Sequence, residues 1–515
     1  MKYLILVLPI FIISFIYKND PVIISTKQGK IEGLVTADGQ VEKYLGIPYA
    51  KPPVGELRWK APQPLEPWKG VRECKEFGNI AIHFKFADWV EFDESKMSED
   101  CLYLNVWKPA NYNGEKLPVL FNIHGGGFWA GQGSEPRLNG EAMAKEGVIV
   151  VTMNYRLHIF GFLAHPELSA ESESGTSGNY GLMDQQMALK WVYENIEAFG
   201  GDPNRITIAG ESAGSMSVLA LMTSPLSKHL VAGAIGSSGG DEKLMAQEPT
   251  EKGHKIVCNM SGLKSIDALR SASVDQLISI CQKPFSPPFQ PIIDNHVLTA
   301  HAHENYKDGQ FADIPLILGW NSWELPPEAF LWTDQYTEKT FKKAVTRVYK
   351  GKRKEVLEMF PHSNYEEIRQ SSADIAGINF VVMGTYKWFN AHRNYSSQPV
   401  YRYQFNKVHP PKKGTDPANY TPAPGARHAE DIPYSWGNLP MMTDFEYTEH
   451  DYKVADLMMK YYLNFIKTGN PNEDDLPNWP FAQKADNEPP VLHFDTNTEV
   501  KKAQNDSRLE TMSKW

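Results

Sequence analysis

Five short apolar runs constrain the fold of this chain more than any other feature of its sequence. Each is rich in branched residues and bounded by Gly, Asn or Asp, and they cover residues 117–123, 148–153, 206–209, 314–318 and 400–405. Such runs are typical of strands buried on both faces of a sheet. Helical patterns lie between these runs. The clearest helical pattern has its apolar residues on one stripe, namely Met183, Met187, Trp191, Val192 and Ile196. This alternation predicts an α/β fold with a single large, mostly parallel, doubly wound sheet flanked by helices.

The length and composition indicate one globular domain. The chain has 515 residues, of which 42% are hydrophobic and 22% charged, and no Gly/Ser-rich or charged linker divides it. We therefore expect a single α/β domain over residues 19–515. The formal net charge of −10 argues against nucleic acid or an anionic membrane as a partner, because each requires a basic face.

The amino-terminal residues indicate export. Lys2 precedes an apolar run over residues 3–17, which is shorter than the roughly 20 residues that a membrane-spanning helix needs. Residues 1–18 are therefore predicted to be a signal peptide, and no hydrophobic tail for a lipid anchor occurs at the other end. We expect a secreted protein without a stable membrane anchor. The candidate glycosylation sites are the sequons at Asn259, Asn394, Asn419 and Asn505.

The cysteines favour disulfides over a metal site. There are four, Cys74, Cys101, Cys258 and Cys281, with no C-x-x-C pair and no histidines at metal-ligand spacing. Three pairings are possible. We predict the sequential one, Cys74 with Cys101 and Cys258 with Cys281, because it closes two short loops.

Residues 210–214 read GESAG and carry the strongest chemical signal in the chain. They follow the apolar run at 206–209 and precede an apolar helical stretch at 216–222. A G-x-S-x-G sequence between a strand and a helix is a nucleophile elbow, in which the glycines permit a strained turn that exposes the serine hydroxyl. Residues 236–240, GSSGG, match the same pattern, but no helix can start directly behind Ser238. We therefore predict Ser212 as the nucleophile and Ser238 as a packed supporting serine.

A glycine-rich loop can supply the hydrogen-bond donors that a tetrahedral oxyanion needs. Residues 124–128, HGGGF, follow the apolar run at 117–123, and their glycines leave backbone amides uncovered by side chains. A flexible turn is the alternative interpretation. The predicted donors are the amides of Gly126, Gly127 and Ala213.

The base and the acid of a triad are expected after the nucleophile, in the order acid and then histidine. His428 lies in a loop of small residues after the last predicted strand, and His409 at the end of that strand is its competitor. Glu324 follows the strand at 314–318 and is the predicted acid. Glu328 or Asp294 could take its place.

Several further motifs, in a fixed order, are similar to those of type-B carboxylesterases, the family that includes cholinesterases, insect juvenile-hormone and odorant esterases, and bile-salt lipase. They are residues 45–50 (LGIPYA), 99–107 (EDCLYLNVW) and 199–203 (FGGDP) running into the elbow, and the likeness covers the chain from about residue 22 onward. The resemblance implies an α/β-hydrolase fold, the triad Ser212, Glu324 and His428, the sequential disulfides, and an ion pair between Arg58 and Glu99. It implies no metal or organic cofactor.

Two departures from the family pattern matter. Residues 325–327 read LPP where the family usually has a glycine after its catalytic glutamate, so the backbone around Glu324 could be rearranged. Glu211 stands where juvenile-hormone esterases usually have glutamine, which disfavours that subfamily. Cholinesterases also place aromatic residues where this chain has Glu91 and Pro327, so we expect a member that is not a cholinesterase.

The sequence thus predicts a secreted serine carboxylesterase that acts on small-molecule esters through an acyl-enzyme. The alternative is a non-catalytic adhesion or binding protein of the same fold. An aromatic group within the first cysteine loop, Phe84, Phe86, Trp89 and Phe92, could line a substrate channel or could be core packing.

Overall fold

The computed structural model describes residues 21–84, 94–111, 113–242, 244–284, 286–416, 422–503 and 506–515. The predicted signal peptide at 1–18 lies outside the described residues. So do Asn419, Asn505, Phe86, Glu91, Trp89 and Phe92.

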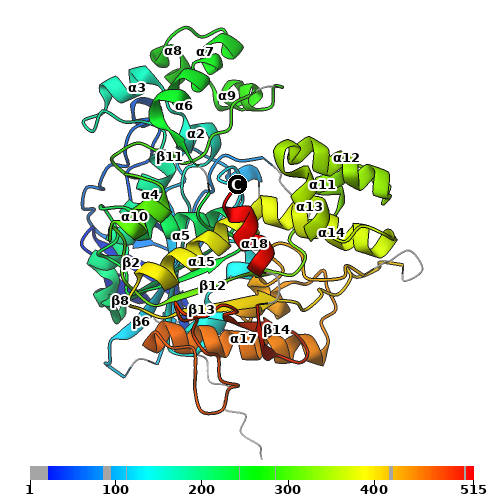
Figure 1. Cartoon of the computed structure of the whole chain (residues 1–515). Coiled ribbons are helices and arrows are strands. Elements are labelled where there is room, and N and C mark those ends of the chain that lie inside the picture. Colours follow the sequence, from blue (N-terminus) through cyan, green and yellow to red (C-terminus); the bar gives the residue numbers. More distant parts are fainter. Residues whose placement is uncertain are drawn as a thin grey trace, which may run out of the picture.

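One twisted sheet forms the centre of the molecule (Figure 1). Its strands are hydrogen-bonded in the order β1-β2-β3-β5-β7-β6-β8-β9-β12-β13-β14-β15, with β4 beside β2. Neighbouring strands from β7 to β14 run parallel, whereas the strands at both edges pair antiparallel except for β4, which runs parallel to β2. The strands are β1 Val22–Ser25, β2 Lys30–Val35, β3 Val41–Pro48, β4 Val71–Glu73, β5 Tyr103–Pro109, β6 Leu117–Ile123, β7 Ile149–Met153, β8 Gly201–Glu211, β9 Gly233–Ser237, β12 Leu316–Asn321, β13 Val400–Phe405, β14 Pro490–Phe494 and β15 Glu499–Lys502; β10 Met245–Ala246 and β11 Ile292–Ile293 form a separate pair.

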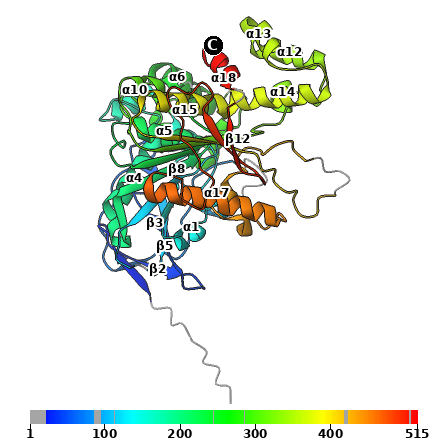
Figure 2. The ribbon, with the colours of Figure 1, turned by 60° about the horizontal axis from the view of Figure 1, so that its bottom comes forward.

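Helices cover both faces of the sheet (Figure 2). They are α1 Glu141–Lys145, α2 His158–Phe162, α3 Pro166–Glu171, α4 Tyr180–Asn195, α5 Ala213–Thr223, α6 Gln247–His254, α7 Ile256–Ser261, α8 Ile266–Arg270, α9 Val274–Cys281, α10 Ala302–Lys307, α11 Glu328–Leu331, α12 Glu338–Val348, α13 Arg353–Met359, α14 Tyr365–Gly377, α15 Met383–Tyr395, α16 Ile432–Ser435, α17 Glu449–Thr468 and α18 Asp506–Ser513. Helices α5, α10 and α15 lie on one face, and α17 lies on the other. The predicted doubly wound α/β architecture is confirmed.

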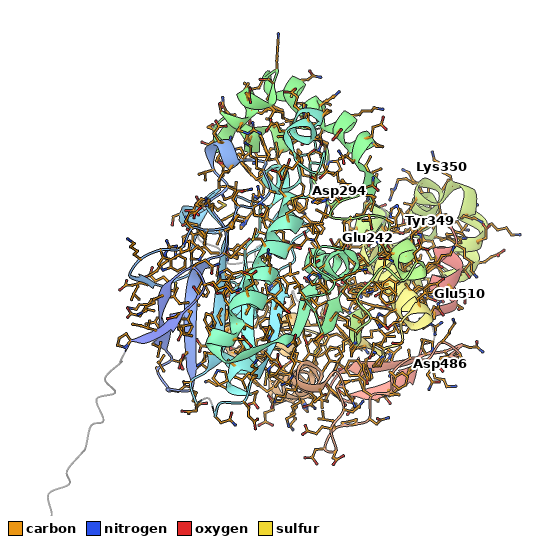
Figure 3. All side chains as sticks on the ribbon, turned by 90° about the vertical axis from the view of Figure 1, so that its left-hand side faces the viewer. Glu242, Asp294, Tyr349, Lys350, Asp486 and Glu510 are labelled. Atoms are coloured by element: carbon orange, nitrogen blue, oxygen red, sulfur yellow. The ribbon has the colours of Figure 1, made fainter. Side chains whose placement is uncertain are left out.

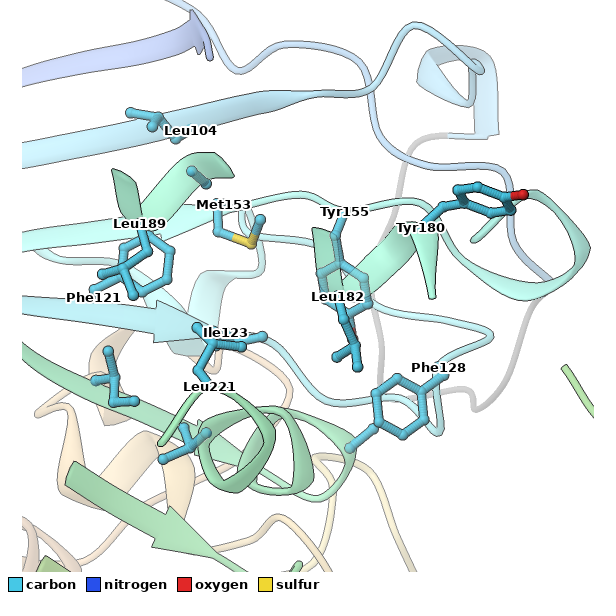
Figure 4. Packing of buried hydrophobic residues seen from close by; sticks show 14 of the residues in the cluster. Leu104, Phe121, Ile123, Phe128, Met153, Tyr155, Tyr180, Leu182, Leu189 and Leu221 are labelled. Carbon is cyan, nitrogen blue, oxygen red and sulfur yellow. The ribbon is translucent and has the colours of Figure 1, made fainter. Parts of the chain in front are cut away.

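The alternation of side chains along the strands divides the core between the two faces. In β6, Phe121 and Ile123 pack into the cluster that contains α4 and α5, whereas Leu120 between them packs into the cluster that contains α1 and α17. Figure 4 shows Phe121 and Ile123 among the buried side chains of the first cluster, close to Leu189 and Leu221. Each of these side chains is at most 1% exposed, so the strands are buried on both faces, as their composition predicts.

A smaller lobe stands beside the carboxyl ends of the central strands. It consists of α11 to α14, and its own apolar cluster includes Phe341, Val345, Val356 and Phe360 together with Leu509 of α18. The alternation of strands and helices did not predict this lobe, because it inserts between β12 and β13 without adding a strand. Among the described residues, no helix has the length and apolar character needed to cross a membrane.

The predicted disulfides are not formed in the structure, where all four cysteines are free thiols. The Sγ of Cys258 lies 3.8 Å from Nε2 of His165, and the Sγ of Cys281 contacts the carbonyl oxygen of Leu277 at 3.4 Å. Burial raises the pKa of Cys74 and that of Cys281 to about 12, which keeps both thiols protonated and unreactive. The sequential pairing is therefore a prediction that the structure does not bear out.

Candidate active site

Ser212 lies at a sharp turn between β8 and α5. Its backbone has φ 57° and ψ −124°, a strained conformation for a residue with a side chain. Glycine is required on both sides of Ser212, because neighbouring backbone leaves no room for a side chain. A Cβ on Gly210 would lie 2.3 Å from the carbonyl carbon of Gly214, and a Cβ on Gly214 would lie 2.1 Å from the Ile123 oxygen. The Ser212 amide donates to the Ser237 oxygen at 2.8 Å, which ties the turn to β9. This is the geometry expected of a nucleophile elbow.

The glycine loop after β6 packs directly against this turn. A Cβ on Gly125 would lie 2.6 Å from the Glu211 carbonyl oxygen and 3.2 Å from the Ser212 Cβ. Gly126 and Gly127 have φ of 104° and 65°, values that residues with side chains rarely adopt. In the described part of the chain, the amides of Gly126, Gly127 and Ala213 donate no hydrogen bond. The loop therefore leaves donors free beside Ser212.

His124 fixes the start of this loop. Its Nδ1 lies 2.8 Å from the Gly125 oxygen, and its ring stacks on Tyr155 with 4.4 Å between centroids. The Tyr155 hydroxyl donates to the His124 oxygen at 3.0 Å. Burial lowers the pKa of His124 to about 4, so this ring is neutral at physiological pH and acts as a packed support.

His428 and Glu324 are in direct contact, although 104 residues separate them in sequence. The Nδ1 of His428 lies 2.6 Å from Oε2 of Glu324. The other carboxylate oxygen of Glu324 accepts from the Ser238 hydroxyl at 2.6 Å and from the Asn321 amide at 2.7 Å. Glu324 is 3% exposed and so has a fixed orientation, and the residues 325–327 that depart from the family pattern do not displace it.

The alternative residues considered from the sequence are engaged elsewhere. Glu328 accepts a hydrogen bond from the Tyr336 hydroxyl, and one carboxylate oxygen of Asp294 accepts from the amides of residues 296–298. The Nε2 of His409 bonds to the Tyr447 hydroxyl at 2.6 Å. Within the described residues, no three His, Cys, Asp or Glu side chains gather into a group that could hold a metal ion.

Comparison with known proteins agrees with this geometry. The sequence profile of the carboxylesterase family matches residues 20–512. The chain belongs to the carboxylesterase family. It is similar to fumonisin B1 esterase of Sphingopyxis macrogoltabida, with 34% identity over 90% of this chain and 85% of that protein. It is also similar to para-nitrobenzyl esterase of Bacillus subtilis (strain 168), with 34% identity over 93% and 96% of the two chains.

Solved structures lead to the same conclusion. A PNB esterase superposes with a TM-score of 0.80 at 31% identity, covering 95% of this chain and 98% of that one. A thermophilic PNB esterase gives a TM-score of 0.79 at 31% identity, over 95% and 99% of the two chains. The protein is thus a carboxylesterase with the α/β-hydrolase fold, an enzyme that hydrolyses carboxylic esters, and the relatives named above are not cholinesterases.

Two residues of this carboxylesterase that contact His428 were missed by the sequence reasoning. Oε1 of Glu211 lies 3.1 Å from Nε2 of His428, and the ring of Phe380 lies edge-on to the imidazole with 4.7 Å between centroids. The sequence did contain a signal that Glu211 belongs to the site, because this carboxylate lies at the end of a buried strand, directly before Ser212. Phe380 belongs to a π-helical turn, Ile378–Val382, that no pattern in the sequence indicated.

The two carboxylates set the electrostatics of the site. Burial raises the pKa of Glu211 to about 7, although the charge of His428 opposes this shift. Burial by itself would lower the pKa of His428, but the charges of Glu211 and Glu324 outweigh it and raise that pKa to about 9. The imidazolium is therefore stabilised from both of its nitrogens.

Proposed function

We propose that Ser212, His428 and Glu324 are the catalytic triad of this carboxylesterase, and that it works through an acyl-enzyme. The observation that carries the proposal is the strained Ser212 turn, with His428 held to Glu324 by a 2.6 Å contact in the same site. A binding protein of the same fold that had lost its chemistry would not need a strained serine, a paired histidine and free loop amides together.

In the proposed first step, His428 removes the proton from the Ser212 hydroxyl as its oxygen attacks the ester carbonyl carbon. In the free enzyme Nε2 of His428 faces Glu211, and the described residues include no hydrogen bond between Ser212 and His428. Catalytic hydrogen bonds are often formed only when substrate is bound. We therefore infer that the imidazole tilts from Glu211 toward Ser212 on substrate binding, while Nδ1 stays on Glu324.

The oxyanion of the tetrahedral intermediate is proposed to accept hydrogen bonds from the amides of Gly126, Gly127 and Ala213. The absence of other acceptors for these amides in the described chain supports this role. Ala213 is the first residue of α5, so the positive end of the helix dipole adds to the stabilisation. His428 then delivers its proton to the alcohol oxygen as the ester bond breaks.

In the second half of the reaction, water attacks the acyl-enzyme with His428 again as the base, and the carboxylic acid leaves. Glu324 keeps the imidazole in the required tautomer throughout. The two relatives are named for esterase activity toward fumonisin B1 and toward para-nitrobenzyl esters, which supports small organic esters as the substrate class.

We further propose that residues 1–18 are a cleaved signal peptide, that residues 19–515 form the mature domain, and that the enzyme is secreted. Of the two sequons in the described residues, Asn259 on α7 is exposed and Asn394 on α15 is half-buried. Asn259 is thus the better acceptor for a glycan. Peptide mapping of the exported protein would show a mature terminus near residue 19 and a glycan on Asn259.

The triad is tested by a pair of serine variants. Ser212→Ala should lower kcat for an aryl acetate by roughly a factor of 1,000 or more, because the attacking oxygen is lost. Ser238→Ala removes one hydrogen bond to Glu324 and should cost about tenfold or less. Both side chains are buried serines in G-x-S-x-G sequences, so the second variant controls for folding. Equal losses in the two variants would contradict the assignment.

A further inference from the structure

The strongest concentration of positive charge lies on the lobe of α12 and α13, outside the catalytic site. Residues 338–358 contain eight Lys and Arg but only three Glu. The eight are Lys339, Lys342, Lys343, Arg347, Lys350, Lys352, Arg353 and Lys354. This segment is therefore strongly basic within a chain whose formal net charge is −10. The net charge of the whole chain argued against an anionic membrane as a partner. That net charge does not describe this basic segment.

Much of this charge has no partner. Lys339, Lys343 and Lys350 are exposed and make no ion pair with any described residue. Three ion pairs occur on the segment among the described residues: Lys342 with Glu338, Lys352 with Glu355 at 3.5 Å and Lys354 with Glu358 at 3.8 Å. Their side chains are between 39% and 86% exposed. Exposed pairs of this kind are weak and exchange readily for other anions.

Large apolar side chains are exposed on the same surface. Trp332 is 75% exposed, Val348 45% and Trp515 41%. Contacts connect them to the basic residues, because the Arg347 guanidinium lies 3.6 Å from the centroid of Trp332 and the Lys352 ammonium lies 5.7 Å from that of Trp515. We call the eight cations together with these three apolar residues the α12–α13 surface. Exposed apolar and aromatic side chains that lie beside several cations are typical of an interaction site.

The α12–α13 surface also borders a hollow of about 550 Å³. Its lining includes Tyr349, the exposed Lys350 and Lys352, the buried Asp241 and the half-buried Glu242. Figure 3 shows Lys350 at the outer edge of the molecule, with Tyr349 between it and Glu242. The acidic groups thus lie inward, and an approaching anionic surface meets the lysines first.

We propose that the α12–α13 surface docks this protein on phospholipid surfaces of net negative charge. Exposed lysines are attracted to anionic headgroups, while Trp332 and Val348 can enter the interfacial region of the lipid. A polyanion such as a sulfated glycan or a nucleic acid would engage the lysines but would leave Val348 in water. Arg347 already covers one face of Trp332, which is then unavailable for stacking on a base or sugar ring. The negative remainder of the chain is repelled by the same surface, so only one orientation is favoured.

The proposal is tested by co-sedimentation of the full-length exported protein with vesicles. The wild type should bind vesicles of phosphatidylcholine with phosphatidylglycerol, should not bind pure phosphatidylcholine, and should be released by salt. Lys343→Gln with Lys350→Gln should weaken binding roughly tenfold or more. The matched control is Lys453→Gln with Lys460→Gln, two exposed lysines of α17 on the opposite face of the sheet, and its binding should change less than twofold.

A second variant separates lipid from other polyanions. Trp332→Ala should weaken vesicle binding and reduce the blue shift of tryptophan emission on vesicle addition, with hydrolysis of a water-soluble ester unchanged. Equal binding by the two double-lysine variants would overturn the proposal. So would a wild type that binds a sulfated polysaccharide but not anionic vesicles, or vesicle binding that is the same with and without Trp332.

Discussion

The histidine of this site has a carboxylate on each ring nitrogen. Glu324 is 2.6 Å from Nδ1 and Glu211 is 3.1 Å from Nε2, and together they raise the pKa of His428 to about 9 despite its burial. A base must be neutral to accept the serine proton. The free enzyme should therefore gain activity with rising pH well above the value near 6.5 of an unperturbed imidazole.

Glu211→Gln tests this electrostatic arrangement. The variant removes one of the two charges that favour the imidazolium, so the pKa of His428 should fall by about one unit or more. Since neutral His428 then predominates down to a lower pH, the acidic limb of the kcat/KM profile should move to lower pH. Measurement of kcat/KM from pH 5 to 10 on a neutral aryl ester checks the direction. A limb that stays in place or moves upward would show that Glu211 does not act on His428.

Between elements, one of the buried ion pairs connects segments that are distant in sequence. The Arg58 guanidinium donates to both oxygens of Glu99 at 2.6 and 2.5 Å, which confirms the pair expected from the family resemblance. Its Nη1 also donates to the carbonyl oxygens of residues 269, 270 and 272 at the end of α8. Those carbonyls could not be predicted, because the sequence does not indicate which loop ends approach one another.

Glu99→Ala should lower the free energy of unfolding by roughly 3 to 5 kcal/mol, since it leaves Arg58 buried without its counter-charge. The matched control is Glu66→Ala, which breaks a pair with Lys51 of 3.0 Å whose two side chains are 40% and 82% exposed. That loss should be below about 1 kcal/mol. Urea unfolding of both variants makes the comparison, and similar losses would contradict the ranking.

For the whole molecule, the sequence predicted the strands whose composition is distinctive. The five apolar runs are β6, β7, β8, β12 and β13, and the ends of several of these strands carry the site. The strand β9 was not among them, because Gly233–Ser237 is glycine-rich and has Ile235 as its one branched residue, although the strand is fully buried. The contact between Glu211 and His428 and the lobe of α11 to α14 depend on tertiary packing, which no local pattern encodes.

We expect that the assembled protein has no choline site. Pro327 directly precedes α11, at a position where cholinesterases have an aromatic residue, so we expect one aromatic platform for a quaternary ammonium to be missing. An aryl acetate of matched size should therefore be cleaved with a kcat/KM at least equal to that for acetylthiocholine. A tenfold preference for acetylthiocholine, about 1.4 kcal/mol in transition-state binding, would mean that another aromatic residue forms the platform.

The central claim, that Ser212 is the nucleophile, is tested most directly by trapping it. A fluorophosphonate should inactivate the enzyme with one equivalent bound, because a phosphonyl group forms a stable covalent bond to an activated serine. Mass spectrometry of the digested protein should place the adduct on the peptide that contains Ser212. An adduct on Ser238, or inactivation with Ser212 unmodified, would contradict the account.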